Sequence, residues 1–155
     1  MRIAYFSPLG PQRTGIADYS EELLPYLAQH AEIDLFVAGC TPSNPALTAR
    51  FPVHDVQEFS TLRTARRYDV ALYQMGNSRF HAAIYETLAR FPGITVLHEY
   101  VLHHLLVEMT VARGDAASYI REMGYCHGVA GTTAARAALC AGHRFPYLDF
   151  PANRR

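Results

Sequence analysis

The chain contains no lysine, and all of its basic side chains are arginine. This absence excludes a Walker-type phosphate-binding lysine, a Schiff-base lysine and a lysine general base. Cysteine is scarce as well: Cys40, Cys126 and Cys140 are odd in number, widely spaced and without a Cys-x-x-Cys pair. That pattern fits a reducing compartment and predicts neither a disulfide framework nor a zinc site.

Net charge is also absent, since 14 basic residues balance 14 acidic ones. A nucleic-acid partner is therefore not expected, because phosphate backbones require a basic surface. No apolar run reaches the ~18 residues of a membrane span, and Met1-Arg2 leads into a strand pattern rather than a signal peptide. We expect a cytoplasmic protein. A predicted helix with Arg63, Arg66 and Arg67 leaves two alternatives open, a solvated surface and peripheral contact with the inner face of the membrane.

Strand-like and helix-like patterns alternate along the chain. Short apolar runs predict buried strands, and apolar residues three or four apart predict helices. This alternation is typical of α/β proteins with a Rossmann-like, doubly wound parallel sheet, and 155 residues suffice for a single domain over 1–155. The predicted strands are 3–6, 33–37, 70–73 and 94–97; the predicted helices are 16–30, 56–67, 80–91, 102–109, 116–123 and 127–140.

The first predicted strand is followed by a loop that contains Gly10, Thr14 and Gly15, and then by a helix. Such a loop directs backbone N–H groups and a helix dipole toward the space above the strand end, where an anion such as phosphate can bind. An ordinary tight connection between strand and helix explains the same residues equally well. In parallel sheets ligands lie at the carboxyl ends of the strands, so this loop is a candidate site.

Two more polar clusters follow predicted strands. Asn77, in the segment Gly76–Ser78, is either a substrate contact or a helix cap. His98, at the end of the last predicted strand, either serves a substrate hydroxyl as hydrogen-bond partner or proton acceptor, or is a structural histidine. The neighbouring Glu99 suggests a metal motif, but Leu102 stands where the HExxH pattern requires histidine, so no metal site is predicted.

With these residues the chain resembles the amino-terminal domain of a GT-B glycosyltransferase of the family 4 type. Members of this family transfer a sugar from a nucleotide-sugar donor to an acceptor, usually with retention of configuration and without a metal or other cofactor. The resemblance covers nearly the whole chain and rests on four segments: the opening strand with Pro8 and residues 10–20, residues 73–78 with His81, residues 96–99 with 102–105, and residues 151–155.

The resemblance implies that the donor phosphate or the substrate is bound by Gly10, Thr14, Gly15, Asn77 and Glu99. It also implies that His98 acts in catalysis near the transferred sugar. It also implies a truncated, acceptor-side domain without the carboxy-terminal donor domain, so that transfer to a glycan or lipid-linked acceptor requires the full-length protein. The alternative is a non-catalytic Rossmann-like module that binds a phosphorylated ligand or a partner chain at an open sheet edge.

Overall fold

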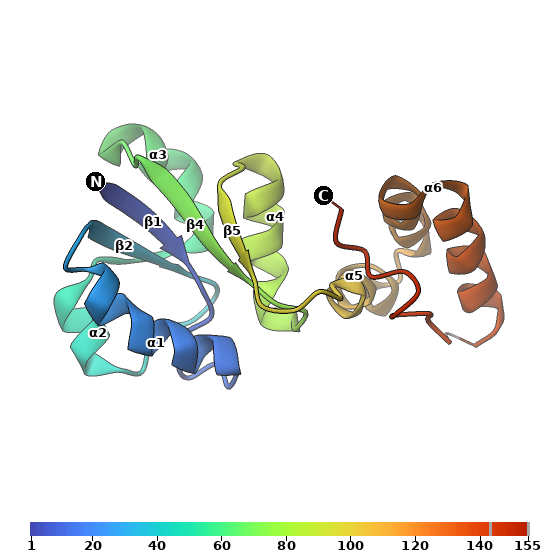
Figure 1. Cartoon of the computed structure of the whole chain (residues 1–155), viewed down its shortest axis with the longest axis horizontal. Coiled ribbons are helices and arrows are strands. Elements are labelled where there is room, and N and C mark those ends of the chain that lie inside the picture. The colour runs from blue at the N-terminus through green and yellow to red at the C-terminus, as the bar shows by residue number, and fades with distance from the viewer. Residues whose placement is uncertain (143, 155) are drawn as a thin grey trace. The chain divides into compact units, whose positions relative to one another are not determined.

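The computed structural model describes residues 1–142 and 144–154 of the chain, which divide into two compact units (Figure 1). Unit 1 comprises Met1–Met75 and Phe80–His98. Unit 2 comprises Gly76–Arg79 and the residues from Glu99 onward.

Unit 1 is built on a five-stranded, all-parallel sheet in the order β3-β2-β1-β4-β5. Helices flank it (Figure 1), which confirms the predicted α/β class with a Rossmann-like, doubly wound sheet. Its strands are β1 (Arg2–Phe6), β2 (Glu32–Val37), β3 (Val53–Asp55), β4 (Val70–Met75) and β5 (Ile94–Leu97). Its helices are α1 (Gly15–Leu27), α2 (Pro45–Arg50), α3 (Phe59–Arg66) and α4 (Ala82–Arg90), with 3₁₀ turns at Val56–Glu58 and Arg79–His81.

Strand β3 and helix α2 were not expected from the sequence, in which residues 40–52, with three prolines, indicate only a loop. Helix α2 begins where the Asn44 side chain accepts a hydrogen bond from the Ala46 amide, with Pro45 as first helical residue. Both elements are too short to display a hydrophobic period. Asp55 forms a capping box with Glu58 at the start of the predicted helix 56–67.

The two faces of the sheet are packed differently. On one face, Leu24 of α1 belongs to an apolar core together with alternate residues of β1 and β2, such as Tyr5 and Leu35. On the other face the packing is aromatic. There the Phe6 ring stacks on Phe36 and on Tyr73, with centroid distances of 4.8 and 4.4 Å. The strands of this sheet centre are therefore buried on both sides, as their apolar runs predict.

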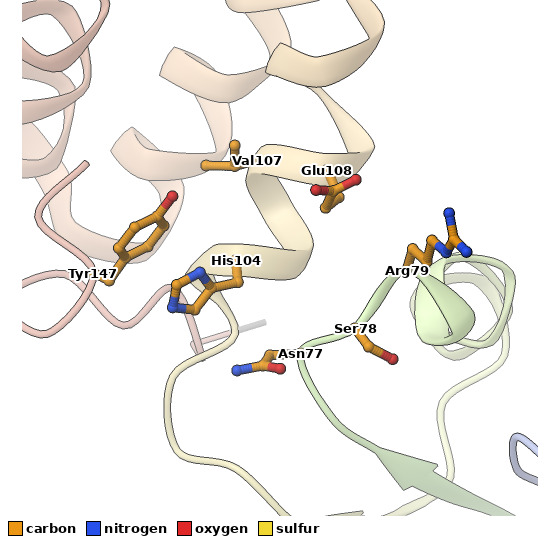
Figure 2. A pocket seen from close by; sticks show the side chains of 7 residues that line it. All are labelled: Asn77, Ser78, Arg79, His104, Val107, Glu108 and Tyr147. Atoms are coloured by element: carbon orange, nitrogen blue, oxygen red, sulfur yellow. The ribbon is translucent and has the colours of Figure 1, made fainter. Parts of the chain in front are cut away.

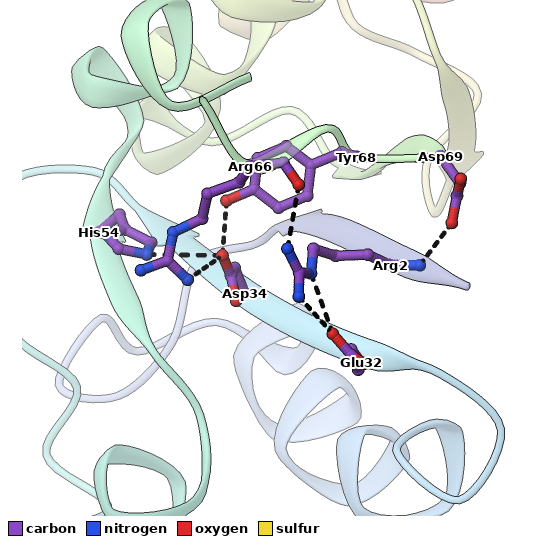
Figure 3. Close-up of polar contacts among 7 residues, drawn as sticks. All are labelled: Arg2, Glu32, Asp34, His54, Arg66, Tyr68 and Asp69. Carbon is purple, nitrogen blue, oxygen red and sulfur yellow. Dashed lines mark hydrogen bonds and ion pairs between the residues drawn. The ribbon is translucent and has the colours of Figure 1, made fainter. Parts of the chain in front are cut away.

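Charged groups join the amino ends of the strands (Figure 3). The Arg2 guanidinium donates to Glu32 of β2, at 2.6 and 3.0 Å, and to the Arg66 carbonyl at 3.0 Å. The Arg2 amide donates to Asp69 just before β4, at 2.7 Å. One side chain and its backbone amide therefore link β1 to β2, to α3 and to the start of β4.

A second group of polar contacts surrounds Asp34, which is only 4% exposed on β2. Its Oδ2 accepts hydrogen bonds from Arg66 of α3 and from the Tyr68 hydroxyl, and His54 Nε2 lies 3.7 Å away (Figure 3). Burial is the main reason why the pKa of Tyr68 is raised. A buried carboxylate needs such partners, so this cluster stabilises the fold at the end of the sheet where the strands begin.

These contacts also bear on the basic helix that suggested membrane contact. Arg66 is engaged with Asp34 at 2.9 Å, and the Arg63 guanidinium lies 4.8 Å from the centroid of the Phe91 ring. Two of the three arginines therefore take part in the packing of unit 1. In the described part of the chain no helix is long and apolar enough to cross a membrane.

Unit 2 is helical, with α5 (His103–Met109), a 3₁₀ turn at Val111–Arg113 and α6 (Ala116–Cys140). Gly128 interrupts α6 with φ 64° and ψ −148°, close to the break that the sequence predicts between 123 and 127. The two halves of α6 approach tightly, since a Cβ at Gly131 would lie 2.3 Å from the Met123 carbonyl oxygen. Glycine is required at this contact because any side chain would separate the backbones.

Hydrogen bonds from two histidines hold the segment after α6 in place. The buried His103 ring places Nδ1 2.6 Å from the Phe150 carbonyl oxygen and Nε2 2.7 Å from the Tyr119 hydroxyl. His127 Nε2 accepts the Ala152 amide at 3.0 Å. Because an imidazole nitrogen accepts a hydrogen bond only when it carries no proton, the contact of His127 requires its neutral form.

The buried histidine makes stability depend on pH. Burial lowers the pKa of His103 from 6.5 to about 4, although the Phe150 carbonyl opposes this shift. The folded state holds the ring neutral, whereas the unfolded chain protonates it below pH 6.5. Its contribution is thus complete above that pH and is lost as the pH falls toward 4, by about 3 kcal/mol.

We expect the substitution His103→Gln to lower the stability of unit 2 at neutral pH and to flatten its decline on acidification. Urea titrations followed by amide NMR signals of α5, above pH 6.5 and near pH 4, measure both effects. The matched control is His30→Gln, at an exposed position after α1, which should leave the decline unchanged. An equally steep decline in the His103 variant would contradict this assignment.

Candidate functional site

The candidate site in unit 1 lies at the carboxyl ends of β1, β4 and β5. Parallel pairing aligns these ends, with Phe6 beside Tyr73 and Met75 beside Leu97. The amide of His98 extends this alignment by donating to the Met75 carbonyl at 2.9 Å. His98 thus leaves the sheet edge where ligands bind in α/β proteins of this type.

Two side chains orient the His98 ring. Its Nε2 lies 2.7 Å from Oε1 of Gln74, a residue of β4 whose side chain is completely buried. Tyr19 of α1 meets the ring edge to face, with the two centroids 4.9 Å apart. The half-buried imidazole is thereby fixed by two contacts, one with the Gln74 side-chain amide and one with the Tyr19 ring.

Buried hydroxyl groups join α1 to the sheet beneath this ring. The Tyr5 hydroxyl donates to Ser20 Oγ at 3.0 Å, and Ser7 Oγ lies 2.7 Å from the same oxygen. Burial raises the pKa of Tyr5 to about 12, so this phenol stays neutral as a hydrogen-bond donor. Ser20 is therefore the contact that sets the position of α1, and of Tyr19 beside it, on β1.

One polar atom in this region lacks a well-placed hydrogen-bond partner. The Nε2 of Gln74 is buried and makes no hydrogen bond of good geometry with a described residue, although the Gln74 amide also interacts with the Tyr5 hydroxyl. An unpaired buried donor costs about 1–3 kcal/mol. Leucine at this position would avoid that cost, so the amide at position 74 is best explained by what its other atom does for His98.

The glycine loop separates into two parts with different roles. The Gly10 amide donates to the Glu21 carboxylate at 3.0 Å, and the Gly10 carbonyl accepts from the Ser43 amide at 2.7 Å. A Cβ at Gly10 would lie 2.7 Å from Ser43 Oγ. Gly10 therefore serves loop packing, and a phosphate at its amide would have to replace a carboxylate of like charge.

The second part of the loop is open. Thr14 caps α1, since its Oγ1 accepts the Ile16 amide at 3.1 Å, and Gly15 is the exposed first residue of the helix. No atom lies within 4 Å of a Cβ built at Gly15. The Ile16, Ala17 and Asp18 amides of this turn bond to Thr14, so what the first turn offers to the open space at Gly15 is the positive end of its helix dipole.

Tyr19 connects helix α1 with His98. Gly15 and Tyr19 are four residues apart on α1 and therefore lie one above the other on the same helix face. The Tyr19 ring reaches from this helix face to His98, with the two ring centroids 4.9 Å apart.

The remaining predicted residues, Asn77 and Glu99, belong to unit 2. Glu99 is exposed and makes no hydrogen bond or ion pair with another described residue. Asn77 lines a cleft of about 470 Å³ (Figure 2). A group of three or more His, Cys, Asp or Glu side chains suited to a metal is not found within 1–142 and 144–154.

Gln74, Tyr19, Ser20 and Tyr5 were missed by the sequence reasoning. Gln74 was visible as an amide at the end of an otherwise apolar strand, which is a signal for a polar role. Tyr19 and Ser20 looked like ordinary residues of an amphipathic helix, and no sequence feature distinguishes them.

We expect Gln74→Leu to release the His98 ring while changing the free energy of unfolding by less than about 1 kcal/mol, because it also removes the unpaired Nε2. Weaker ring-to-ring NOEs between His98 and Tyr19 would show the release. The matched control is Gln12→Leu, which removes a hydrogen bond to the Ala38 carbonyl and should leave these NOEs intact. A large loss of stability with an unmoved ring would make Gln74 a structural residue.

The two loop glycines should respond differently to alanine. Gly15→Ala meets open space and is expected to leave the free energy of unfolding unchanged or slightly higher, since alanine favours helix. Gly10→Ala meets Ser43 and Glu21 and is expected to lower it by about 1–3 kcal/mol. Denaturant titrations of both variants measure the difference, and equal losses would contradict the division of the loop.

Comparison with known proteins adds no relative. A scan against protein-family models finds no match, and searches of curated proteins and of solved structures find none either. The side chains at the carboxyl edge of the sheet are therefore the basis for a functional assignment.

Proposed function

We propose that the chain is the acceptor-side domain of a retaining, metal-independent glycosyltransferase, which moves a sugar from a nucleotide-sugar donor to a glycan, lipid or similar acceptor. The observation that supports it best is the His98 ring at the carboxyl edge of the sheet, oriented by Gln74 and Tyr19. The resemblance of these segments to family 4 glycosyltransferases points to the same chemistry.

The chemistry of glycosyl transfer fits this arrangement. Cleavage of a glycosyl–phosphate bond develops positive charge on the sugar ring and negative charge on the leaving diphosphate. The helix dipole at Gly15 favours a negative leaving group, and the absence of a side chain there permits close approach of its oxygens. These features support a place for the leaving group at the start of α1.

His98 suits the sugar side of the same reaction. With one ring nitrogen against Gln74, the imidazole has a fixed orientation and can hydrogen-bond a sugar hydroxyl near the bond that breaks. Fixed positioning of this kind lowers the entropy cost of the transition state. In the proposed enzyme a second α/β domain supplies the contacts to the donor nucleotide.

The test is to read the gene past the codon for Arg155 and to assay the complete product with UDP-, GDP- and ADP-sugars. We expect release of nucleoside diphosphate, and His98→Ala is expected to lower kcat by roughly 10²–10⁴-fold. Gln74→Leu should lower it less, because it disorders the ring without removing it. His30→Ala, at an exposed position after α1, is the matched control and should retain full activity.

Two outcomes would contradict the proposal. Unchanged turnover in His98→Ala would exclude the catalytic role of this ring. A complete product that releases no nucleoside diphosphate from any of the three donor classes would favour a binding module instead.

One observation favours that second candidate, a non-catalytic module that binds a partner chain. Strand β5 lies at the edge of the sheet, and its Ile94 and Leu97 side chains are 57% and 42% exposed. An exposed, apolar edge strand readily pairs with a further strand. Under this alternative, a partner strand added at β5 is the function of unit 1, and His98 is a structural residue.

A further inference from the structure

Unit 2 contains a cleft of about 470 Å³ that neither the fold of unit 1 nor the His98 site explains (Figure 2). This volume lies in the range that small-molecule sites occupy. One helix face of α5 supplies His104, Val107 and Glu108, three to four residues apart. The segment after β4 supplies Asn77, Ser78 and Arg79, and the segment after α6 supplies Tyr147.

One wall of the cleft is an ordered aromatic pair. The Tyr147 ring stacks on His104 with a centroid distance of 3.7 Å and an interplanar angle of 20°. The backbone around Tyr147 is fixed by the buried His103, which contacts the Phe150 carbonyl, and by the Pro151 carbonyl, which accepts from the Leu102 amide at 2.8 Å. This wall is therefore in place before any ligand binds.

The polar groups of the cleft are balanced in charge. Arg79 and Glu108 line the cleft with opposite charges (Figure 2). Burial, followed by the nearby Glu108 carboxylate, raises the pKa of Tyr147, so its hydroxyl remains a donor. The side chains of Asn77 and Glu108 form no hydrogen bond or ion pair within the described residues. These two groups can thus bind a ligand without breaking internal contacts.

This combination selects among ligand classes. The attraction of Arg79 for a phosphate would be opposed by the Glu108 carboxylate in the same cleft, and a purely apolar ligand would leave Asn77 and Glu108 desolvated without partners. A cation would find one carboxylate and a single imidazole, too few ligands for a metal site. A neutral ring with several hydroxyl groups meets each requirement, since its hydroxyls both donate and accept and its C–H face packs on an aromatic wall.

We propose that this cleft binds a neutral monosaccharide unit, with Glu108 and Asn77 as hydrogen-bond partners and the Tyr147–His104 pair as the stacking wall. The inference rests on the proposed function, in which this cleft holds the acceptor. The acceptor group bound here is then a neutral sugar rather than a phosphorylated or lipid head group. Asn77 is thereby a contact to the acceptor instead of the donor phosphate.

The test titrates the chain with D-glucose, D-galactose, D-mannose and N-acetyl-D-glucosamine, and separately with inorganic phosphate, followed by amide NMR shifts. At least one sugar is expected to give saturable, millimolar binding with shifts centred on Asn77, His104 and Glu108.

Glu108→Gln should weaken that binding about tenfold, and Asn77→Ala about fivefold. Tyr147→Phe keeps the ring and should retain binding, whereas Tyr147→Leu should weaken it. The matched control is Glu22→Gln, on an exposed carboxylate of α1, which should bind like the unsubstituted chain.

Three results would overturn the inference: saturable shifts at these amides with phosphate but no sugar, sugar binding unaffected by Glu108→Gln, or no sugar-dependent shifts at all. None of these measurements uses a sugar nucleotide, so their failure is separate from failure of the proposed function. If the full-length protein transfers sugar but no sugar binds in this cleft, only the proposed sugar site is refuted. If sugar binds in this cleft but the full-length protein transfers none, only the proposed transferase function is refuted.

Discussion

The contact between Ser20 and the sheet is the constraint on which the candidate site depends. Ser20 Oγ is completely buried and meets both Tyr5 and Ser7 of the first strand and its loop, so α1 has one permitted position along β1. Neighbouring residues of the same helix then reach their own partners. Tyr19 contacts His98, and the Glu21 carboxylate holds the Gly10 amide at 3.0 Å and the Asn44 amide group at 2.8 Å.

A buried polar network is costly unless every group in it has a partner, because the low dielectric of the interior strengthens both the contacts and the penalties. In this site the hydroxyls are paired, whereas Gln74 keeps one amide nitrogen without a hydrogen bond of good geometry. An apolar strand end would be more stable locally. The amide is therefore best understood as a support for His98, in the manner of the second layer of groups that fix reactive side chains.

The sequence predicted much of this fold, and the reasons are physical. A doubly buried parallel strand gives an apolar run, and an amphipathic helix gives a period of three to four residues, so β1 and α1 were recognised. The location of His98 at a strand end followed from the same patterns. Strand β3 and helix α2 were missed because elements of three and six residues carry no period.

Partnerships between side chains were beyond reach from the sequence. The sequence does not indicate that Gln74 contacts His98, because this contact depends on the pairing of β4 with β5 and on side-chain rotamers. The two loop glycines illustrate the same limit. The sequence alone does not distinguish Gly10 from Gly15, yet Gly10 is packed against Ser43 and Gly15 borders open space. Only tertiary structure separates a glycine needed for packing from one that leaves room for a ligand.

Two histidines five residues apart show how far environment decides chemistry. His103 is completely buried, and burial lowers its pKa to about 4, so it remains a neutral structural link between α5 and the chain after α6. His98 is partly exposed at a sheet edge, with an amide that orients it rather than a core that encloses it. A ring that must stay neutral to hold a fold is poorly suited to exchange protons with a substrate. The catalytic role that we propose is therefore given to His98 and not to His103, which instead links α5 to the chain after α6.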